Sequence, residues 1–142
     1  MTRTNPPVFD CDDLANLLSL SAERLSLLLK VAEKLYERFP LQTKRRRPRW
    51  IEAPKPLLKL VQRRLLDRLL YEVPPHSAAH GFYPELSIVT NARVHVGSAW
   101  VISYDLEDFF PSTDEAKVRQ VLRSHYALEG TTLEAILRLT CR

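Results

Sequence analysis

The strongest constraint on the fold is an apolar run that ends directly in carboxylates, between Trp100 and Ser112. The stretch 99–104 is rich in β-branched and aromatic residues, which favour a β-strand. Asp105 follows that strand and Asp108 comes three residues later, so both carboxylates are expected where the strand passes into a loop. Mg²⁺ is often held by one or two carboxylates together with substrate phosphates. The pattern therefore fits a magnesium site, and equally an ordinary strand end at Asp105 with a helix cap at Asp108.

Bulk properties limit the class of protein. The chain has 142 residues, of which 45% are hydrophobic and 27% are charged, so we expect one ordinary domain or part of a larger one. No stretch of eighteen apolar residues and no signal-peptide pattern is present. Cys11 and Cys141 offer neither a disulfide framework nor metal-ligand spacing, which fits a reducing cytoplasm. These features predict a cytoplasmic protein without a membrane segment.

Positive charge is concentrated in one segment. Between Lys44 and Arg68 there are ten basic residues against only Glu52 and Asp67, so this segment carries +8 and the remainder −4. A local basic block on a nearly neutral background predicts a surface that binds a polyanion such as nucleic acid. The plainer interpretation, a solubilising surface, stays open.

Capping and turn signals divide the first half of the chain. We expect one helix after the acidic residues that begin at Asp10, and a second helix capped by Ser21. Short aromatic and apolar stretches at 35–42 and 50–53 are expected to form strands, joined by a basic loop tip at 44–48.

The second half is predicted to alternate helices with the apolar run. A strong amphipathic helix begins at Pro56 and stops before Pro74, and a further helix is expected over 87–95. Ser112 and Thr131 each start a sequence typical of a capping box. The last helix has an apolar stripe with no later element in the chain to pack on. Its abrupt end favours truncation or a missing partner.

Other chemistries find little support. His76 and His80 have i, i+4 spacing but follow two prolines, and no further pair completes a tetrahedral zinc site. The three glycines are scattered, so no phosphate-binding loop is predicted. Cys141 and Ser112 have no visible base partner, so nucleophilic catalysis is not predicted either.

Three ordered blocks resemble a known family. The first block is Arg49-x-Ile51-x-x-Pro54 followed by Leu58-Lys59-x-x-Gln62-Arg63. The second block is Ala79-His80-Gly81-Phe82 followed by Ser87-Ile88-x-x-Asn91-Ala92-x-x-His95. The third block is Asp105-Leu106-x-Asp108-Phe109-Phe110-Pro111-Ser112. In this order they resemble the fingers and the first catalytic palm block of bacterial reverse transcriptases of the retron and group II intron type.

The resemblance implies an α+β fold that is part of a right-hand polymerase. Residues 1–34 would form an N-terminal helical segment and residues 35–98 the fingers. Residues 99–142 would form an incomplete palm, with the first catalytic strand and the helices that follow it.

The third block would carry the chemistry of the site. By resemblance, Asp105 is the first catalytic ligand of Mg²⁺, and the backbone N–H groups of Asp108 and Phe109 face the triphosphate. Phe110, five residues after Asp105, is the bulky residue that screens against a ribose 2′-hydroxyl.

The fingers would supply positive charge. By resemblance, Arg49 and a basic neighbour such as Lys44 bind the incoming nucleoside triphosphate, because guanidinium pairs well with phosphate oxygens. Arg63 and Arg64 would follow the template backbone. The residues assigned to nucleic-acid binding are Arg45, Arg46, Arg47, Lys59, Arg63 and Arg64.

Two departures from the family pattern limit what the chain is expected to do alone. The glycine usual in the fingers turn is replaced by residues 45–48, and the Tyr/Phe-x-Asp-Asp block that supplies further carboxylates is absent. The one Asp-Asp pair, Asp12-Asp13, lies in a helix-start context, and no thumb is present. We therefore expect the N-terminal half of a reverse transcriptase, an RNA-directed DNA polymerase, that is inactive by itself.

The expected partners follow from that interpretation. They are an RNA template, a DNA primer, a deoxynucleoside triphosphate, a second polypeptide with the missing block and thumb, and a noncoding RNA. The resemblance to retron-type reverse transcriptases also implies a role in antiviral defence, although no residue pattern in this sequence indicates that role. The alternative is a non-catalytic RNA- or DNA-binding remnant that kept the basic fingers.

Overall fold

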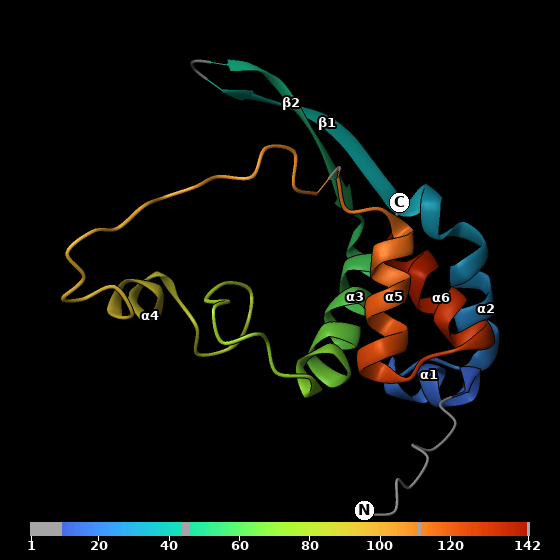
Figure 1. Ribbon diagram of the computed structural model, residues 1–142. Helices are drawn as coiled ribbons and strands as arrows, with labels where there is room; N and C mark the ends of the chain where they lie inside the picture. Colours follow the sequence, from blue (N-terminus) through green and yellow to red (C-terminus); the bar gives the residue numbers. More distant parts are fainter. Residues whose placement is uncertain (1–9, 44–45, 111, 142) are drawn as a thin grey trace, which may run out of the picture.

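The computed structural model describes residues 10–43, 46–110 and 112–141, with the side chains of residues 43 and 46–49 outside the description. Figure 1 shows three parts: a body of packed helices, a long β-hairpin that extends from it, and a wide excursion of the chain over residues 73–114. The excursion leaves the body after α3 and returns at α5.

The first two helices have the caps that the sequence predicts. Helix α1 spans Cys11–Leu17, and the Asp10 carboxylate accepts hydrogen bonds from two backbone N–H groups of its first turn, at 2.8 and 2.9 Å. Helix α2 spans Ala22–Val31, and the Ser21 hydroxyl accepts from the Arg24 N–H. These side chains satisfy backbone donors that a helix start leaves unpaired, so both helix starts are confirmed.

The predicted strands form a single antiparallel hairpin. A short 3₁₀ helix, η1 (Ala32–Leu35), leads into β1 (Tyr36–Thr43), which pairs with β2 (Arg46–Pro54). The hairpin is longer than expected, because β1 extends to Thr43 and β2 already begins at Arg46, within the stretch 44–48 that was predicted to be a loop tip. Of that tip, Lys44 and Arg45 lie outside the described residues.

Helix α3 spans Pro56–Arg68, so it begins at Pro56 as predicted but ends before the predicted stop at Pro74, and the short 3₁₀ helix η2 (Leu70–Glu72) follows it. Apolar residues spaced three and four apart lie on one face of the helix, and Leu58, Val61 and Leu65 are completely buried there. The opposite side keeps Lys59 and Arg63 exposed, which is the amphipathic arrangement that the sequence predicts.

Helix α6 (Gly130–Thr140) forms the centre of the body, where it packs against α1, α2, α3, η1 and α5 (Glu115–Tyr126). Leu133, Ile136 and Leu139 are essentially fully buried there. The expectation that its apolar stripe has nothing to pack on was therefore wrong, because helices from the start of the chain cover it.

Both predicted capping boxes in this half were also wrong. Asp114, not Ser112, caps α5 through a hydrogen bond from the Lys117 N–H, so the helix begins two residues later than predicted. Helix α6 already begins at Gly130, with no side-chain cap, which places Thr131 inside the helix.

The excursion contains one short helix, α4 (Ile88–Arg93), within the predicted range 87–95 and with the Ser87 hydroxyl as its cap. The predicted strand 99–104 was wrong: the chain there is irregular and exposed throughout. A strand needs a neighbour to accept and donate its backbone hydrogen bonds. Among the described residues no strand lies beside this stretch, since the one sheet consists of β1 and β2.

The structure thus confirms a mixed α+β composition of helices and a small sheet. The right-hand polymerase architecture and the three segments assigned to it stay predictions. Among the described residues, no helix is long and apolar enough to cross a membrane.

Candidate functional site

Asp105 lies on the returning arm of the excursion, directly after the apolar stretch. Its side chain is exposed, and so are those of every other described residue from Asn91 to Phe110. Among the described residues, no group of three or more His, Cys, Asp and Glu side chains is placed to hold a metal ion. Asp105 alone supplies one carboxylate, which fits the kind of ligand that Mg²⁺ uses but leaves most of the coordination to other groups.

The chain reverses immediately after Asp105. Asp108 has a left-handed backbone with φ of 50°, a conformation that Asp tolerates better than most residues. Its carbonyl accepts hydrogen bonds from both the N–H and the hydroxyl of Ser112, at 2.9 and 2.8 Å. Ser112 therefore closes this turn instead of capping α5. The rings of Phe109 and Phe110 meet edge to face, with centroids 5.4 Å apart.

The second sequence block ties the outgoing arm of the excursion to the body. The Tyr83 hydroxyl donates to the Tyr71 carbonyl at 2.7 Å, and the two rings pack edge to face. Further along, His80 Nδ1 lies 3.1 Å from the Thr90 hydroxyl, next to the cap of α4. These contacts explain why aromatic and hydroxyl residues occur in that block. They are structural roles that the sequence analysis did not assign.

Gln62 of the first block has a structural role that sequence reasoning missed. Its side-chain amide donates to the Tyr36 hydroxyl at 2.9 Å and to the Leu139 carbonyl at 2.7 Å. It therefore joins α3 to the base of the hairpin and to the end of α6. Gln62 comes four residues after Leu58 and three before Leu65, so its place on the apolar face of α3 was the available signal.

Arg63 and Arg64 differ in what surrounds them. The Arg64 guanidinium donates to the Leu18 carbonyl at 2.6 Å, and Arg68 donates to the Leu17 carbonyl at 2.6 Å. Both arginines thus satisfy carbonyls that the end of α1 leaves unpaired. Arg63 is exposed on the same helix.

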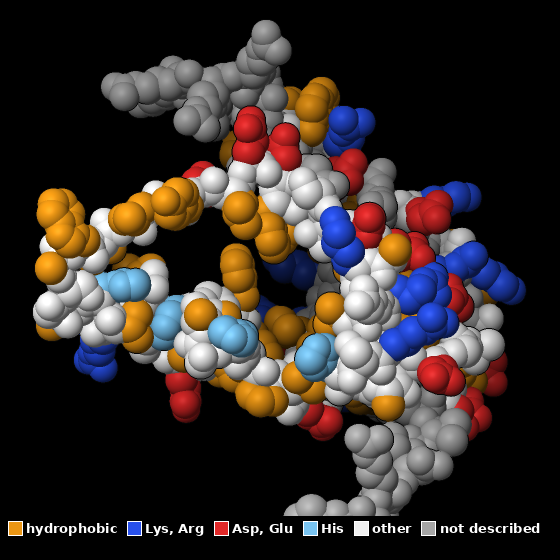
Figure 2. Space-filling model, viewed as in Figure 1, with side chains coloured by type: hydrophobic (Ala, Val, Ile, Leu, Met, Phe, Trp, Pro, Cys, Tyr) orange, Lys and Arg blue, Asp and Glu red, His pale blue; other side chains and the backbone are white. Residues whose placement is uncertain are grey.

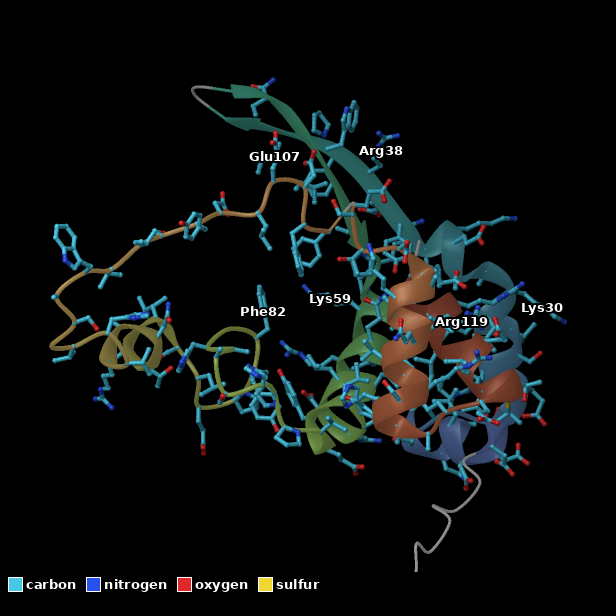
Figure 3. The ribbon with its side chains drawn as sticks, in the orientation of Figure 1. Lys30, Arg38, Lys59, Phe82, Glu107 and Arg119 are labelled. Atoms are coloured by element: carbon cyan, nitrogen blue, oxygen red, sulfur yellow. The ribbon has the colours of Figure 1, made fainter. Side chains whose placement is uncertain are left out.

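Lys59 and Phe82 face the space between the body and the excursion (Figure 3). In the space-filling view this region is hollow (Figure 2), with hydrophobic side chains along the excursion and most of the visible Lys and Arg side chains over the body. Phe82 is 92% exposed, which is unusual for a phenylalanine in a folded chain.

The hairpin presents an aromatic and charged cluster. Arg38 lies over the Trp50 ring, 4.7 Å from the ring centroid, and its Nε is 3.9 Å from Glu52. The register explains the contact, because Pro40 pairs with Trp50 and Arg38 pairs with Glu52. Successive residues of a strand alternate between faces, so these side chains share one face of the hairpin.

The remaining predicted residues of the fingers are only partly described. Lys44 and Arg45 lie outside the described residues, and Arg46, Arg47 and Arg49 are described only as backbone of β2. Their assignment to nucleotide or nucleic-acid binding stays a prediction.

A separate charged cluster stabilises the contact between α5 and α6. Arg119 bridges Glu115, at 2.6 Å, and Glu134. The hydrogen bond from Arg119 lowers the pKa of the Glu134 carboxyl below its usual value of 4.5. A shallow depression of about 350 Å³ lies beside it, lined by α5 residues that include Arg119 and Arg123. None of the predicted site residues lines that depression.

Comparison with curated proteins identifies relatives. The chain is 45% identical over 84 residues to the retron Mx162 reverse transcriptase and 49% identical over 74 residues to the retron Mx65 reverse transcriptase, both of Myxococcus xanthus. These matches cover 59% and 52% of the chain. A longer match, 32% identical over 84% of the chain, is to the retron Ec86 reverse transcriptase of Escherichia coli.

The matches cover only part of each relative. The chain spans 17% of the length of each of the two Myxococcus proteins and 38% of the Escherichia protein. No family model matches the chain. With these relatives, the chain corresponds to the N-terminal portion of a retron-type reverse transcriptase.

Proposed function

We propose that this chain is the N-terminal part of an RNA-directed DNA polymerase, to which it contributes the fingers and one metal-binding carboxylate. The observation that carries the proposal is the 32% identity to a retron reverse transcriptase over 84% of the chain. A match of that extent necessarily includes Asp105 and the fingers hairpin.

The proposed reaction is the attack of a primer 3′-hydroxyl on the α-phosphate of a deoxynucleoside triphosphate, with release of pyrophosphate. Mg²⁺, when bound, would neutralise charge on the phosphates and activate the attacking hydroxyl. Within this chain, Asp105 holds the metal and Phe110 excludes a 2′-hydroxyl. Lys44 and Arg49 bind the triphosphate, helped by the backbone N–H groups of Asp108 and Phe109.

The basic residues of the fingers would hold the nucleic acid by its phosphates. Such contacts do not depend on sequence and weaken as salt rises. Arg64 is excluded from this role in our proposal because its guanidinium is already bonded to the end of α1. The proposed set is Arg45, Arg46, Arg47, Lys59 and Arg63.

These 142 residues are proposed to be inactive alone, because one exposed carboxylate cannot align two reacting oxygens. A second segment or polypeptide with the Tyr-x-Asp-Asp block and a thumb would complete the site. An RNA template, a DNA primer and a noncoding RNA complete the proposed partners, and the proposed location is the cytoplasm.

Reconstitution tests the proposal. The chain is mixed with the part of the retron Ec86 reverse transcriptase that it does not match, and extension of a primed RNA template is measured with Mg²⁺. We expect extension from the mixture and none from the chain alone. Asp105→Ala should reduce extension by about 100-fold or more, the scale of losing a group that stabilises transition-state charge.

Glu107→Gln is the matched control, since it removes an exposed carboxylate two residues away in the same segment. It should leave extension close to wild type. Primer extension by the chain alone would contradict the proposed inactivity. RNA binding without extension, and with no effect of Asp105→Ala, would favour the non-catalytic binding module.

A further inference from the structure

Trp50 is held in a fixed setting at the surface rather than buried. Its side chain is 57% exposed on a hairpin that extends from the body, although tryptophan is on average among the most buried residues. Arg38 lies over one face of the indole ring and is itself positioned by Glu52, so the ring is oriented while much of the side chain stays exposed.

The chemistry of this face is that of a stacking platform. Pro40 lies directly across from Trp50 and adds a second flat apolar surface, while Arg38 offers a positive charge beside the ring. The segment from Lys44 to Arg68, which includes β2 and α3, carries a net charge of +8. A ligand that matches both properties is a polyanion with exposed aromatic rings.

We propose that this face of the hairpin, formed by Arg38, Pro40 and Trp50, binds a single-stranded nucleic acid by stacking an unpaired base on Trp50. The inference rests on the proposed function and deepens it, because it names a contact with the unpaired strand outside the reaction site. Base-on-aromatic stacking tolerates any sequence, since every base has a π-face.

A duplex does not fit this face. In a duplex the faces of the bases are covered by their neighbours, so a lone surface tryptophan has no ring to stack on. Arg38 also points away from Lys59 and Phe82, which face the hollow beside the excursion (Figure 3). This face of the hairpin is therefore on a different side of the molecule from the hollow. It would bind the part of a nucleic-acid strand that lies before or after the part in the hollow.

The two tryptophans of the chain allow a direct test. Trp100→Phe removes the second tryptophan, which is 90% exposed in the excursion, and leaves Trp50 as the single tryptophan. This variant is titrated with single-stranded RNA about 12 nucleotides long and with an abasic oligomer of the same length and charge. We expect RNA to quench the Trp50 fluorescence and the abasic oligomer to bind without quenching it.

Affinity measurements complete the test. Trp50→Ala should weaken binding of the RNA by about 5- to 100-fold and leave binding of the abasic oligomer unchanged. Trp50→Phe should keep most of the affinity. The matched control is Phe39→Ala, which removes an aromatic side chain, 43% exposed, from the other face of the same hairpin. Circular dichroism checks that each variant folds.

The outcomes separate this inference from the proposed function. Equal losses of affinity for RNA and for the abasic oligomer in Trp50→Ala would overturn stacking while leaving nucleic-acid binding intact. A larger loss from Phe39→Ala than from Trp50→Ala would place the contact on the other face. Failure of the wild-type chain to bind any oligomer would overturn this inference, whereas the proposed function would still be decided by the reconstitution experiment.

Discussion

The helical body and the excursion both contain large apolar residues, but these side chains are buried in the body and exposed in the excursion. In the body, Leu58, Leu133 and Ile136 are at most 1% exposed. In the excursion, Trp100 and Ile102 are 90% and 72% exposed. Of the described residues, none between Tyr71 and Lys117 belongs to the hydrophobic core. The body is therefore stabilised by its own contacts, whereas the segment that carries Asp105 is not.

The exposed apolar residues of the excursion indicate which part of the molecule another element would contact. Contiguous exposed apolar residues in a folded chain usually mark a surface that another element covers. The excursion has such residues on both sides of the predicted strand 99–104. The stretch around Asp105 is exposed in this way, and the chain spans only 17–38% of the length of the relatives described above.

The largest expected effect compares the same substitution in the two regions. Ile136→Ala should lower the free energy of unfolding by about 2–5 kcal/mol, because it leaves a cavity in the core. Ile102→Ala should change it by less than about 0.5 kcal/mol, since that side chain contacts little in the chain. Urea unfolding followed by circular dichroism measures both.

The same two variants can also contradict this contrast between the body and the excursion. A loss of more than about 1 kcal/mol from Ile102→Ala in the isolated chain would mean that the excursion packs on the body in solution. If the proposed partner covers the excursion, Ile102→Ala should instead weaken reconstitution with that partner while leaving the stability of the isolated chain unchanged.

Sequence reasoning succeeded where the determinants are local. The caps at Asp10 and Ser21 depend on side chains and backbone groups two or three residues apart, so the residues themselves decide them. The spacing of Leu58, Val61 and Leu65 likewise decides which face of α3 is buried. The hairpin was predicted for the same reason, although its length was not.

Sequence reasoning failed where a distant partner decides. The stretch 99–104 has strong strand propensity, but propensity cannot supply a neighbouring strand. Thr131 fits a capping box, yet α6 already begins at Gly130, so the local pattern did not decide where this helix starts. The roles of Gln62 and Arg64 depend on Leu139 and Leu18, which are far away in the sequence. For the candidate site, the sequence supplied Asp105 and the basic block, and their placement relative to a substrate stays a prediction.

An effect of intermediate size on the free energy of unfolding is expected to distinguish two neighbouring arginines of α3. Arg64→Met should lower the free energy of unfolding by about 1–2 kcal/mol, because the Leu18 carbonyl loses a charged donor. Arg63→Met should leave stability unchanged, and we expect it to reduce RNA affinity and lower the salt slope of binding by about one. The same urea unfolding experiment and a salt titration of RNA binding measure these effects.

The opposite result would change the assignment of the basic face. If Arg64→Met lost RNA affinity without losing stability, its bond to α1 would be dispensable, and α3 would contact nucleic acid with both arginines. If Arg63→Met destabilised the body, the exposed side of α3 would have a structural role that its exposure does not suggest.

The smallest expected effect concerns the charged link between α5 and α6, and it is visible through pH. The pKa of Glu134 is lowered mainly by its hydrogen bond from Arg119, so the folded state favours the ionised carboxylate. The stabilisation is therefore complete above the usual pKa of 4.5 and is lost as pH falls through the lower pKa of the folded state. Arg119→Gln should unfold more easily than wild type near neutral pH, and this difference should shrink under acid conditions.

Because the pair is exposed to solvent, salt should also reduce the difference between wild type and Arg119→Gln. Glu107→Gln, in the excursion, is the control and should unfold like wild type at each pH, since its exposed side chain lies outside the body. If the effect of Arg119→Gln were unchanged by acid and salt, the apolar part of the arginine packing on α6 would account for it. The body would then be held by apolar contacts even at its charged edge, which would make its contrast with the excursion sharper.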